Sequence, residues 1–420
     1  MILGAIALLV VTLLGAPLFA VIGASAMLGF HREGVNLSVV AIEFFGLSET
    51  PVLVAIPLFT FAGFLLSEGH APRRLLRLTQ ALVGWLPGGL AIICLVVCAL
   101  LTAFTGASGV TIIALGAVLM PALTEAGYDE RFNLGLITAS GSLGLLFAPS
   151  LPLILYGVVA QAPIDEMFVA GLLPGTLMIA LLSAYSLWRN RNVPRGPAVR
   201  SVSALWGAIR NARWDLPLPF VVLGGIYSGY FAVSEAAAVT ALYVVLVECV
   251  ILREVPWRAL PRIMRESTVL IGAILVILGV SLASTNYMID AGVPQQMFAL
   301  VSQYVSGPNT FLLVLLVFLL VLAAILDIFS ATVLIVPLLL PVASQFGVDP
   351  VHLGIIFLAA MELGYLTPPH GLNLFIASHR FEKDITEIYW AAQPFLLVSL
   401  LAVIIIAFWP GLSLMLLHRG

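Results

Sequence analysis

The feature that most constrains this chain is an internal repeat, in which the second half echoes the first 220 positions later around breaks in long apolar runs. Aligning residues 119–149 on 339–369 gives 9 identities in 31, against about 3 expected by chance from this composition. The matches include Pro121/Pro341, Gly144/Gly364 and Pro149/Pro369. Paired Gly/Pro interruptions in two hydrophobic halves are typical of secondary transporters whose site lies between the repeats.

Composition places the chain in a membrane. Hydrophobic residues make up 61% of the 420 residues and charged residues only 9%, too few charges to cover a soluble fold of this size. At about 20 residues per span, the length allows roughly 10–13 membrane segments. The apolar run Met1–Phe30 is too long for a cleaved signal peptide and is expected to be the first span.

Two segments are longer than one bilayer crossing and carry small residues in the middle. The first extends from Pro87 to Pro121 around Thr105-Gly106-Ala107-Ser108, and the second from Pro308 to Pro341. We expect each to be a re-entrant hairpin of two half-length helices; a single kinked span is the alternative.

A broken helix is expected after each hairpin. The first, Asn133–Ala160, is interrupted at Ser140-Gly141-Ser142 and at Ala148-Pro149-Ser150; the second, His352–Ser378, contains Thr367-Pro368-Pro369. We expect the breaks to be formed by Gly144, Pro149, Pro152, Gly364, Pro368 and Pro369.

The orientation follows from an arginine-rich loop. Residues 189–213 hold six arginines and no acid, which places the loop in the cytoplasm. Counting spans from there, the first hairpin opens to the cytoplasm and the second to the outside. The expected fold is therefore an all-α polytopic membrane protein of two inverted-topology repeats.

The expected division of the chain has five parts. Residues 1–86 form scaffold and arm helices, and 87–160 the first hairpin with its broken helix. Scaffold helices and the arginine loop follow in 161–307, the second hairpin with its broken helix in 308–380, and a C-terminal helix in 381–420, with a last span from Pro394 to Leu416.

Irregular backbone at membrane depth can coordinate a cation through its carbonyls, and helix N-termini can attract an anion. Hydroxyls at the breaks add oxygen ligands, although any one of them can equally bond back to its own helix. The ion-binding candidates are Thr105, Gly106, Ser108, Ser140, Ser142, Asp327, Ser330, Thr332 and Thr367.

Two acids lie within apolar stretches, where carboxylates mark functional sites. Asp327, beside the second tip, is expected to bind an ion or shape the tip. Glu362 is expected to bind an ion or to anchor the helix break by accepting backbone hydrogen bonds.

Enzyme signatures are missing from the sequence: the six histidines form no HExxH, and no Walker A sequence is present, so the chain is not expected to be an enzyme or to use ATP directly. Cys94, Cys98 and Cys249 lie in apolar segments and are expected to pack in the core rather than hold a metal.

Several segments strongly resemble the large membrane subunit of tripartite ATP-independent periplasmic (TRAP) transporters, over essentially the whole chain. They are Ile56–Gly63, Phe104–Ser108, Pro121–Asp129, Ala148–Gly157, Phe168–Gly175 and, most specific, Glu362–Phe375. Two positions depart from the family pattern: His370 stands where a small aliphatic residue is usual, and Ala232-Val233-Ser234 precedes Glu235 in place of Thr-Pro-Thr.

The resemblance implies a Na⁺-coupled symport of small organic acids by an elevator mechanism in the bacterial inner membrane. It implies no cofactor beyond Na⁺ as the coupling ion, and two partners: a small four-helix membrane subunit and a periplasmic substrate-binding protein. The substrate-binding candidates are Ser108, Ser150, Ser330, Pro369, His370 and Asn373. The alternative is a stand-alone cation-coupled carboxylate transporter of the same broad superfamily.

Overall fold

The computed structural model describes residues 8, 10–12, 14–83, 88–192, 202–305 and 307–417, which form helices and contain no β-strand. Helix is the expected outcome for apolar runs in lipid, because it satisfies every backbone hydrogen bond within the segment. The all-α prediction is therefore confirmed. Residues 1–7, 9 and 13 of the predicted first span, the start of the first hairpin at Pro87, and Arg195 and Arg200 of the arginine loop lie outside the described residues.

The N-terminal part supplies long helices and an amphipathic arm. These are α2 (Leu18–Arg32), α3 (Ser38–Gly46), the 3₁₀ turns Leu47–Glu49 and Pro51–Val54, α4 (Ala55–Glu68) and α5 (Ala71–Val83). Polar and apolar residues alternate along α5 with helical spacing, so one face is buried and the other carries Arg73 and Arg77 to the surface.

The first hairpin consists of α6 (Gly89–Thr105) and α7 (Ser108–Glu125), which pack against each other. α6 ends where Gly106 takes a φ of +64°, a left-handed conformation that favours glycine. Each limb has about half the length of the predicted segment, as expected, but the predicted end at Pro121 is wrong. The limbs have 17 and 18 residues, and Pro121 lies inside α7. Because 17 helical residues are about 26 Å long, the limbs must tilt or begin outside the hydrocarbon to bring the tip to mid-membrane.

The first broken helix starts at Asp129, whose side chain accepts a hydrogen bond from the Phe132 N–H. It consists of α8 (Glu130–Ser140), a 3₁₀ turn (Leu143–Leu146) and α9 (Leu151–Ala160), with a bend of 42°. The predicted interruption is therefore present.

The middle of the chain contains α10 (Ile164–Ala170), α11 (Leu172–Arg189), α12 (Val202–Asn211), α13 (Pro217–Tyr227) and α14 (Val233–Val245). α14 continues as a π-helix over Leu246–Ile251, and a short 3₁₀ turn at Trp257–Ala259 leads into α15 (Leu260–Asp290). The arginine loop, 189–213, therefore extends from the end of α11 to a point just before α13 and contains α12.

The second half contains α16 (Val293–Val301), the hairpin helices α17 (Pro308–Ala323) and α18 (Ile328–Gln345), the broken pair α19 (Pro350–Gly364) and α20 (Leu372–Phe381), α21 (Ile385–Phe408) and α22 (Gly411–Leu414). Two predicted boundaries are wrong here: α18 continues past Pro341 to Gln345, and the last long helix begins at Ile385 with Pro394 inside it. Neighbouring helices allow proline within apolar helices, so proline is a weaker boundary signal here than in a soluble protein.

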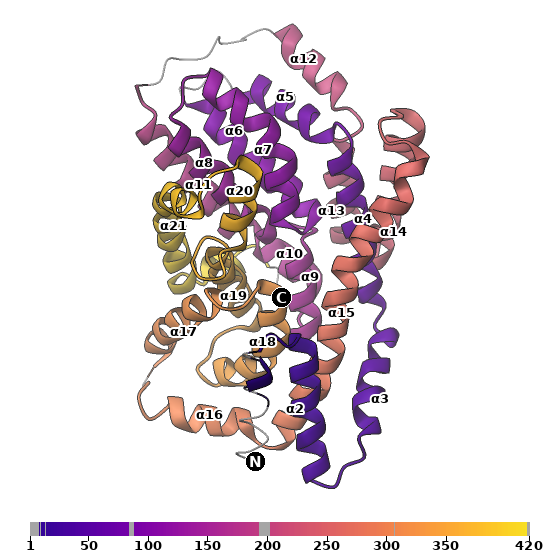
Figure 1. Ribbon diagram of the computed structural model, residues 1–420, viewed down its shortest axis with the longest axis vertical. Coiled ribbons are helices and arrows are strands. Elements are labelled where there is room, and N and C mark those ends of the chain that lie inside the picture. The colour runs from indigo at the N-terminus through magenta and orange to yellow at the C-terminus, as the bar shows by residue number, and fades with distance from the viewer. Residues whose placement is uncertain are drawn as a thin grey trace.

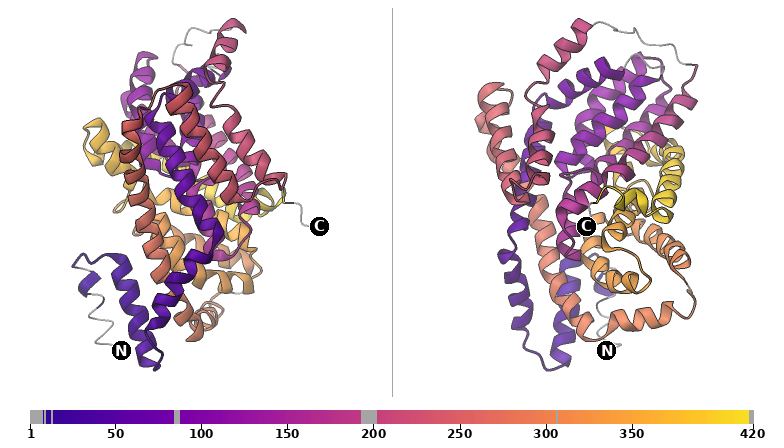
Figure 2. Two further views of the ribbon diagram at one scale, coloured as in Figure 1. Left: turned by 90° about the vertical axis from the view of Figure 1, so that its right-hand side faces the viewer. Right: turned by 180° about the vertical axis from the view of Figure 1, so that it is seen from behind.

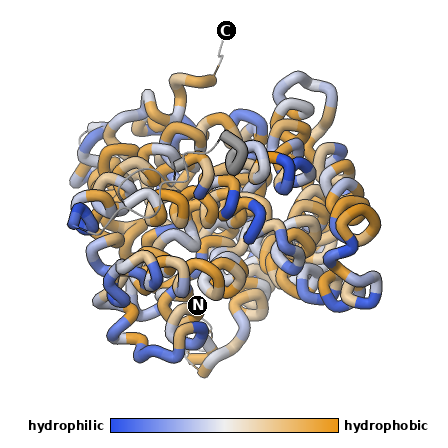
Figure 3. The backbone as a smooth tube through the Cα atoms, turned by 90° about the horizontal axis from the view of Figure 1, so that it is seen from above, coloured by the Kyte–Doolittle hydropathy of each residue, from blue (hydrophilic) through white to orange (hydrophobic). Residues whose placement is uncertain are grey.

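Figure 1 shows the first hairpin, α6–α7, in the upper part of the molecule and the second, α17–α18, in the lower part. The long α15 runs beside α2, α3 and α4; these helices face the viewer in the left view of Figure 2 and lie along one side in the right view. Seen from above, apolar residues extend to the periphery (Figure 3), as expected for a protein solvated by lipid.

Seven helices among the described residues are long and apolar enough to cross a membrane, or eight if the bent α8–α9 pair is one span. The count is below the 10–13 expected from length, because α2, α6, α13, α17 and α19 are apolar but have only 11 to 17 residues. The predicted five-part division remains a prediction.

Candidate functional site

The tip of the first hairpin packs tightly on two neighbours. A Cβ on Gly106 would lie 2.6 Å from the Leu151 Cβ at the start of α9, and one on Gly63 of α4 would lie 2.3 Å from the Phe104 carbonyl oxygen. Thr105 is buried, and its hydroxyl makes two long contacts with Ala107, to the carbonyl oxygen and to the backbone N–H, each at 3.4 Å. A side chain at either Gly106 or Gly63 would therefore clash, so both positions require glycine.

Two threonines that the sequence prediction missed tie the hairpin to the first helix break. The Thr102 hydroxyl lies 2.6 Å from the Thr111 hydroxyl and donates to the Gly141 carbonyl oxygen at 2.7 Å. Both threonines are fully buried. This chain of hydrogen bonds joins α6, α7 and the end of α8. The only sequence signal for these two threonines was a weak one: both are polar residues in apolar helices near Gly106.

The first break is held by small residues and local hydrogen bonds. A Cβ on Gly144 would lie 2.2 Å from the Ala99 carbonyl oxygen of α6. Ser150 is buried and donates to the Leu145 carbonyl oxygen at 2.6 Å, while Ser140 donates to the Ile137 carbonyl oxygen at 3.1 Å. The Ala148–Pro149 peptide bond is cis, and Pro152 occupies the first turn of α9.

The tip of the second hairpin is organised by Asp327. Its carboxylate Oδ1 accepts hydrogen bonds from the Phe329 and Ser330 N–H groups at 2.9 and 3.0 Å and so caps α18. This is the tip-shaping role expected of an acid at a helix N-terminus. The Thr332 hydroxyl is bonded back to the Ile328 carbonyl oxygen at 2.6 Å.

The second break repeats the close approach seen at the first. A Cβ on Gly364 would lie 2.2 Å from the Ala323 carbonyl oxygen of α17. The His370 N–H donates to the Ala324 carbonyl oxygen at 3.1 Å, which ties the break to the second tip. The Pro368–Pro369 peptide bond is cis, and both prolines are exposed. Thr367 bonds back to its own helix, at the Leu363 carbonyl oxygen.

Among the described residues, a few buried polar atoms around the breaks have no hydrogen-bond partner. They include both carboxylate oxygens of Glu362, Nε2 of His370 and Oδ1 of Asn373. The anchoring role expected for Glu362 is therefore wrong, because it accepts no backbone hydrogen bond. Asn373 uses its amide Nδ2 to donate to the Thr138 carbonyl oxygen of α8 at 3.2 Å.

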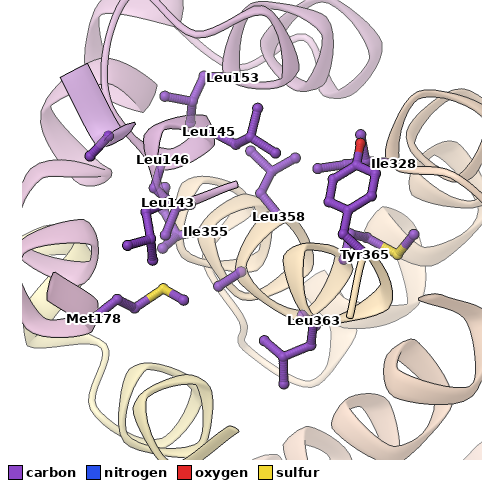
Figure 4. Close-up of a cluster of buried hydrophobic side chains, with 14 of the residues drawn as sticks. Leu143, Leu145, Leu146, Leu153, Met178, Ile328, Ile355, Leu358, Leu363 and Tyr365 are labelled. Atoms are coloured by element: carbon purple, nitrogen blue, oxygen red, sulfur yellow. The ribbon is translucent and has the colours of Figure 1, made fainter. Parts of the chain in front are cut away.

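These contacts bring the first tip, both breaks and α20 together. A Cβ on Gly109 of α7 would lie 2.6 Å from the Ile376 side chain of α20, and Asn373 of α20 is bonded to α8. Figure 4 shows Leu143, Leu145 and Leu146 of the first break in one apolar cluster with Leu363 and Tyr365 of the second and with Ile328 beside the second tip. The hydroxyls of Ser108, Ser142 and Ser330 make no hydrogen bond with the described residues, so they can serve a ligand.

An ionic cluster that the sequence prediction missed lies near the start of α5, around Arg74. The Arg74 guanidinium of α5 contacts Asp215 at 2.6 Å, Glu248 at 2.8 Å and Glu254 at 2.5 Å. Asp215 precedes α13, and Glu248 and Glu254 belong to the end of α14 and the turn that follows. The cluster joins three segments distant in sequence, which is why no local pattern announced it.

Residues 3–412 match the family described as tripartite ATP-independent periplasmic transporter, DctM component. The chain belongs to this family. The C4-dicarboxylate TRAP transporter large permease protein DctM of Pseudomonas aeruginosa is 33% identical over 93% of this chain and 92% of its own length. The isethionate TRAP transporter permease protein DctMQ of Oleidesulfovibrio alaskensis is 31% identical over 95% of this chain and 64% of its own length.

Among solved structures, the Alcanivorax borkumensis YdaH transporter has the same overall fold, with a TM-score of 0.56 at 16% identity, over 90% of this chain and 88% of that chain. The chain is thus a TRAP transporter large permease, a multi-pass protein of the inner membrane. This family is one of transporter permeases rather than enzymes.

Proposed function

We propose that this permease carries small organic acids into the cell, coupled to Na⁺, by an elevator movement of the two hairpins and broken helices. One observation carries the proposal: two helix breaks pack in one cluster, and each is joined to a hairpin tip, by Thr102 to Gly141 in the first half and by Ala324 to His370 in the second. Irregular backbone at that depth is tolerated only where it is buried in protein or lines a solute path.

The inverted repeat is supported by local features that recur 220 residues apart. Gly127 and Gly347 both have positive φ, Asp129 and Asp349 both cap the helix that follows, and the glycines of the breaks meet the carbonyls of Ala99 and Ala323. The hairpins also lie in opposite parts of the molecule in Figure 1. Opposite entry of the two hairpins is what an inverted-topology transporter requires.

The Na⁺ ligands we propose are oxygen atoms at the tips and breaks. Na⁺ coupling in such folds uses unwound backbone carbonyls near helix breaks. Ser108, Ser142 and Ser330 add hydroxyls that have no partner among the described residues, and Asp327 adds a carboxylate beside the second tip. Thr332 and Thr367 are weaker candidates, because their hydroxyls are bonded to their own helices.

For the organic acid, we propose capture by helix N-termini. α7, α9, α18 and α20 all begin at a tip or break, and the partial positive charge of a helix N-terminus favours an anion. Ser108, Ser330, Pro369, His370 and Asn373 stand at or near these starts. Ser150 is the weakest substrate candidate, since its buried hydroxyl is already bonded to Leu145. The names of the relatives from P. aeruginosa and O. alaskensis, which specify a C4-dicarboxylate and isethionate, favour an anionic substrate.

The moving unit we propose consists of residues 87–160 and 308–380, and the remaining helices form the fixed scaffold. The proposed partners are a small membrane subunit and a periplasmic substrate-binding protein. The family description is that of a tripartite transporter, and the O. alaskensis relative, whose name combines two components, is longer than this chain.

The test is substrate uptake into proteoliposomes that contain the permease and its small subunit. We expect uptake of a dicarboxylate only with the binding protein outside and an inward Na⁺ gradient. Replacing Na⁺ with K⁺ should abolish it. Saturable uptake by the purified permease alone would overturn the tripartite proposal and favour the stand-alone carboxylate transporter, and uptake independent of Na⁺ would overturn the coupling.

A further inference from the structure

An apolar cavity lies beside α5 and extends along α6 to Phe104, close to the tip of the first hairpin. It has a volume of about 390 Å³, within the usual range of ligand pockets, about 300–1,000 Å³. Its walls come from α5, α6, α13 and α14 and include Leu78, Val96, Leu101, Leu218 and Val247. A space of this size and lining suits a hydrocarbon chain better than a polar solute.

The cavity opens sideways on the surface of the protein. Three of its lining residues are exposed: Phe220 at 75%, Leu82 at 50% and Leu100 at 38%. Because α6 and α13 are apolar helices, this surface faces lipid in the membrane. An acyl chain of a bilayer lipid can therefore enter from the side without crossing water.

One end of the cavity carries an aromatic residue suited to a lipid headgroup. Trp214 lines the cavity, and its indole N–H has no acceptor among the described residues. Tryptophan prefers the level of the headgroups, where its ring is in apolar surroundings and its N–H reaches a polar group. The Trp214 carbonyl oxygen accepts a hydrogen bond from the Tyr243 hydroxyl at 2.7 Å, which fixes the backbone here. The free indole N–H can donate to a lipid ester or phosphate oxygen.

Positive charge lies beside Trp214 and on the neighbouring helices. The Arg213 guanidinium lies over the Trp214 ring, 5.4 Å from its centroid. Arg73 and Arg77 are exposed on α5, and Arg210 is exposed on α12, which packs against α5 through Ala208, Ala212 and Leu78. The acid in the lining, Asp215, is bound by Arg74. The segments next to Trp214 therefore carry more positive than negative charge.

We propose that the cavity binds an anionic phospholipid of the cytoplasmic leaflet, with one acyl chain between α5, α6, α13 and α14 and the phosphate at Arg213 and Trp214. The arginine-rich loop places this end of the protein on the cytoplasmic side, where such lipids are attracted by basic side chains. The proposal does not depend on Na⁺ coupling or on the identity of the transported acid.

Native mass spectrometry of the purified permease, titrated with phosphatidylglycerol or phosphatidylcholine, tests the proposal. We expect tighter binding of phosphatidylglycerol, and a loss of about five-fold in its affinity in Arg213→Gln. Arg265→Gln, which removes an exposed arginine from α15, should leave the affinity unchanged. Arg213 is exposed, so its replacement should not affect folding.

A second pair of variants tests the cavity itself. Val96→Trp fills it and should lower lipid occupancy at least as much as Arg213→Gln, whereas Val317→Trp, on an exposed face of α17, should not. Equal affinity for the two lipids, unchanged binding in Val96→Trp, or binding of free oleate as tight as that of phosphatidylglycerol would overturn the proposal. So would loss of the small membrane subunit from Val96→Trp with lipid binding intact, which would assign the cavity to a partner helix.

Discussion

Asp327 shows how one carboxylate can have a structural and a ligand-binding role. Both of its hydrogen bonds to the α18 N-terminus are accepted by Oδ1. Oδ2 accepts none from the described residues and remains available to a cation. The sequence predicted ion binding or tip shaping for this residue, and the geometry supports tip shaping directly.

Replacing Asp327 with Asn separates the two roles. Asn keeps an acceptor for the Phe329 and Ser330 N–H groups, so stability should change by only a few tenths of a kcal/mol, while Asp327→Ala should cost about 1 kcal/mol. If the charge helps to hold Na⁺, the Na⁺ concentration that gives half-maximal uptake should rise several-fold in Asp327→Asn. Normal uptake with an unchanged Na⁺ requirement would limit Asp327 to capping.

At the level of helices, the breaks depend on close backbone contact. Adding a methyl group at Gly144 or Gly364 places carbon 2.2 Å from a carbonyl oxygen of the neighbouring hairpin limb, so backbone must move. Gly144→Ala and Gly364→Ala should each destabilise the protein by about 1–3 kcal/mol and reduce uptake. Thermal unfolding in detergent measures the first effect.

Gly272→Ala is the matched control for the break glycines. Gly272 lies inside α15 with no heavy atom within 4 Å of an added Cβ, so alanine should leave stability equal or higher by about 0.5–1 kcal/mol. The account of the breaks is contradicted if all three alanine variants unfold at the same temperature.

The Arg74 cluster holds α5 against the end of α14, and we expect the stability that it contributes to depend on pH. Burial alone would raise the pKa of Glu254, but hydrogen bonds from the His70 backbone N–H and the Arg74 guanidinium lower this pKa below its ordinary value of 4.5. The stability that Glu254 contributes is then complete above pH 4.5 and is lost as the pH falls through the lower, folded-state pKa.

Glu254→Gln should therefore lower the unfolding temperature at neutral pH and make its decline below pH 4.5 less steep. Glu125→Gln, at an exposed position at the end of α7, should leave both unchanged. Parallel pH profiles for the wild type and Glu254→Gln would show that the ion pair adds no stability.

The sequence predicted the helical elements better than the contacts between them. Both hairpins and both breaks could be predicted, because the sequence itself contains a 220-residue repeat and apolar segments that are too long for one span. The contacts Arg74–Asp215, Thr102–Gly141 and Asn373–Thr138 could not, because each joins residues 39 to 235 positions apart that become neighbours only after packing. Helix ends at Pro121, Pro341 and Pro394 were also wrong, since packed apolar helices tolerate proline.

At the scale of the whole molecule, the proposal is that the two hairpins form one unit whose tips reach water from opposite sides in turn. Ser108 and Ser330 lie in the first turns of α7 and α18 and are both buried in this structure. The native cysteines Cys94, Cys98 and Cys249 are buried as well, so the labelling of the chain without introduced cysteines has to be measured as the background.

The most direct measurement is therefore the sidedness of labelling of Ser108→Cys and Ser330→Cys in membrane vesicles of known orientation. Labelling should be compared with and without Na⁺, substrate and the binding protein. The account predicts that labelling of each cysteine shifts between the cytoplasmic and the outer side as the conditions change. Labelling of both cysteines from one side alone, under every condition, would contradict the inverted-repeat elevator.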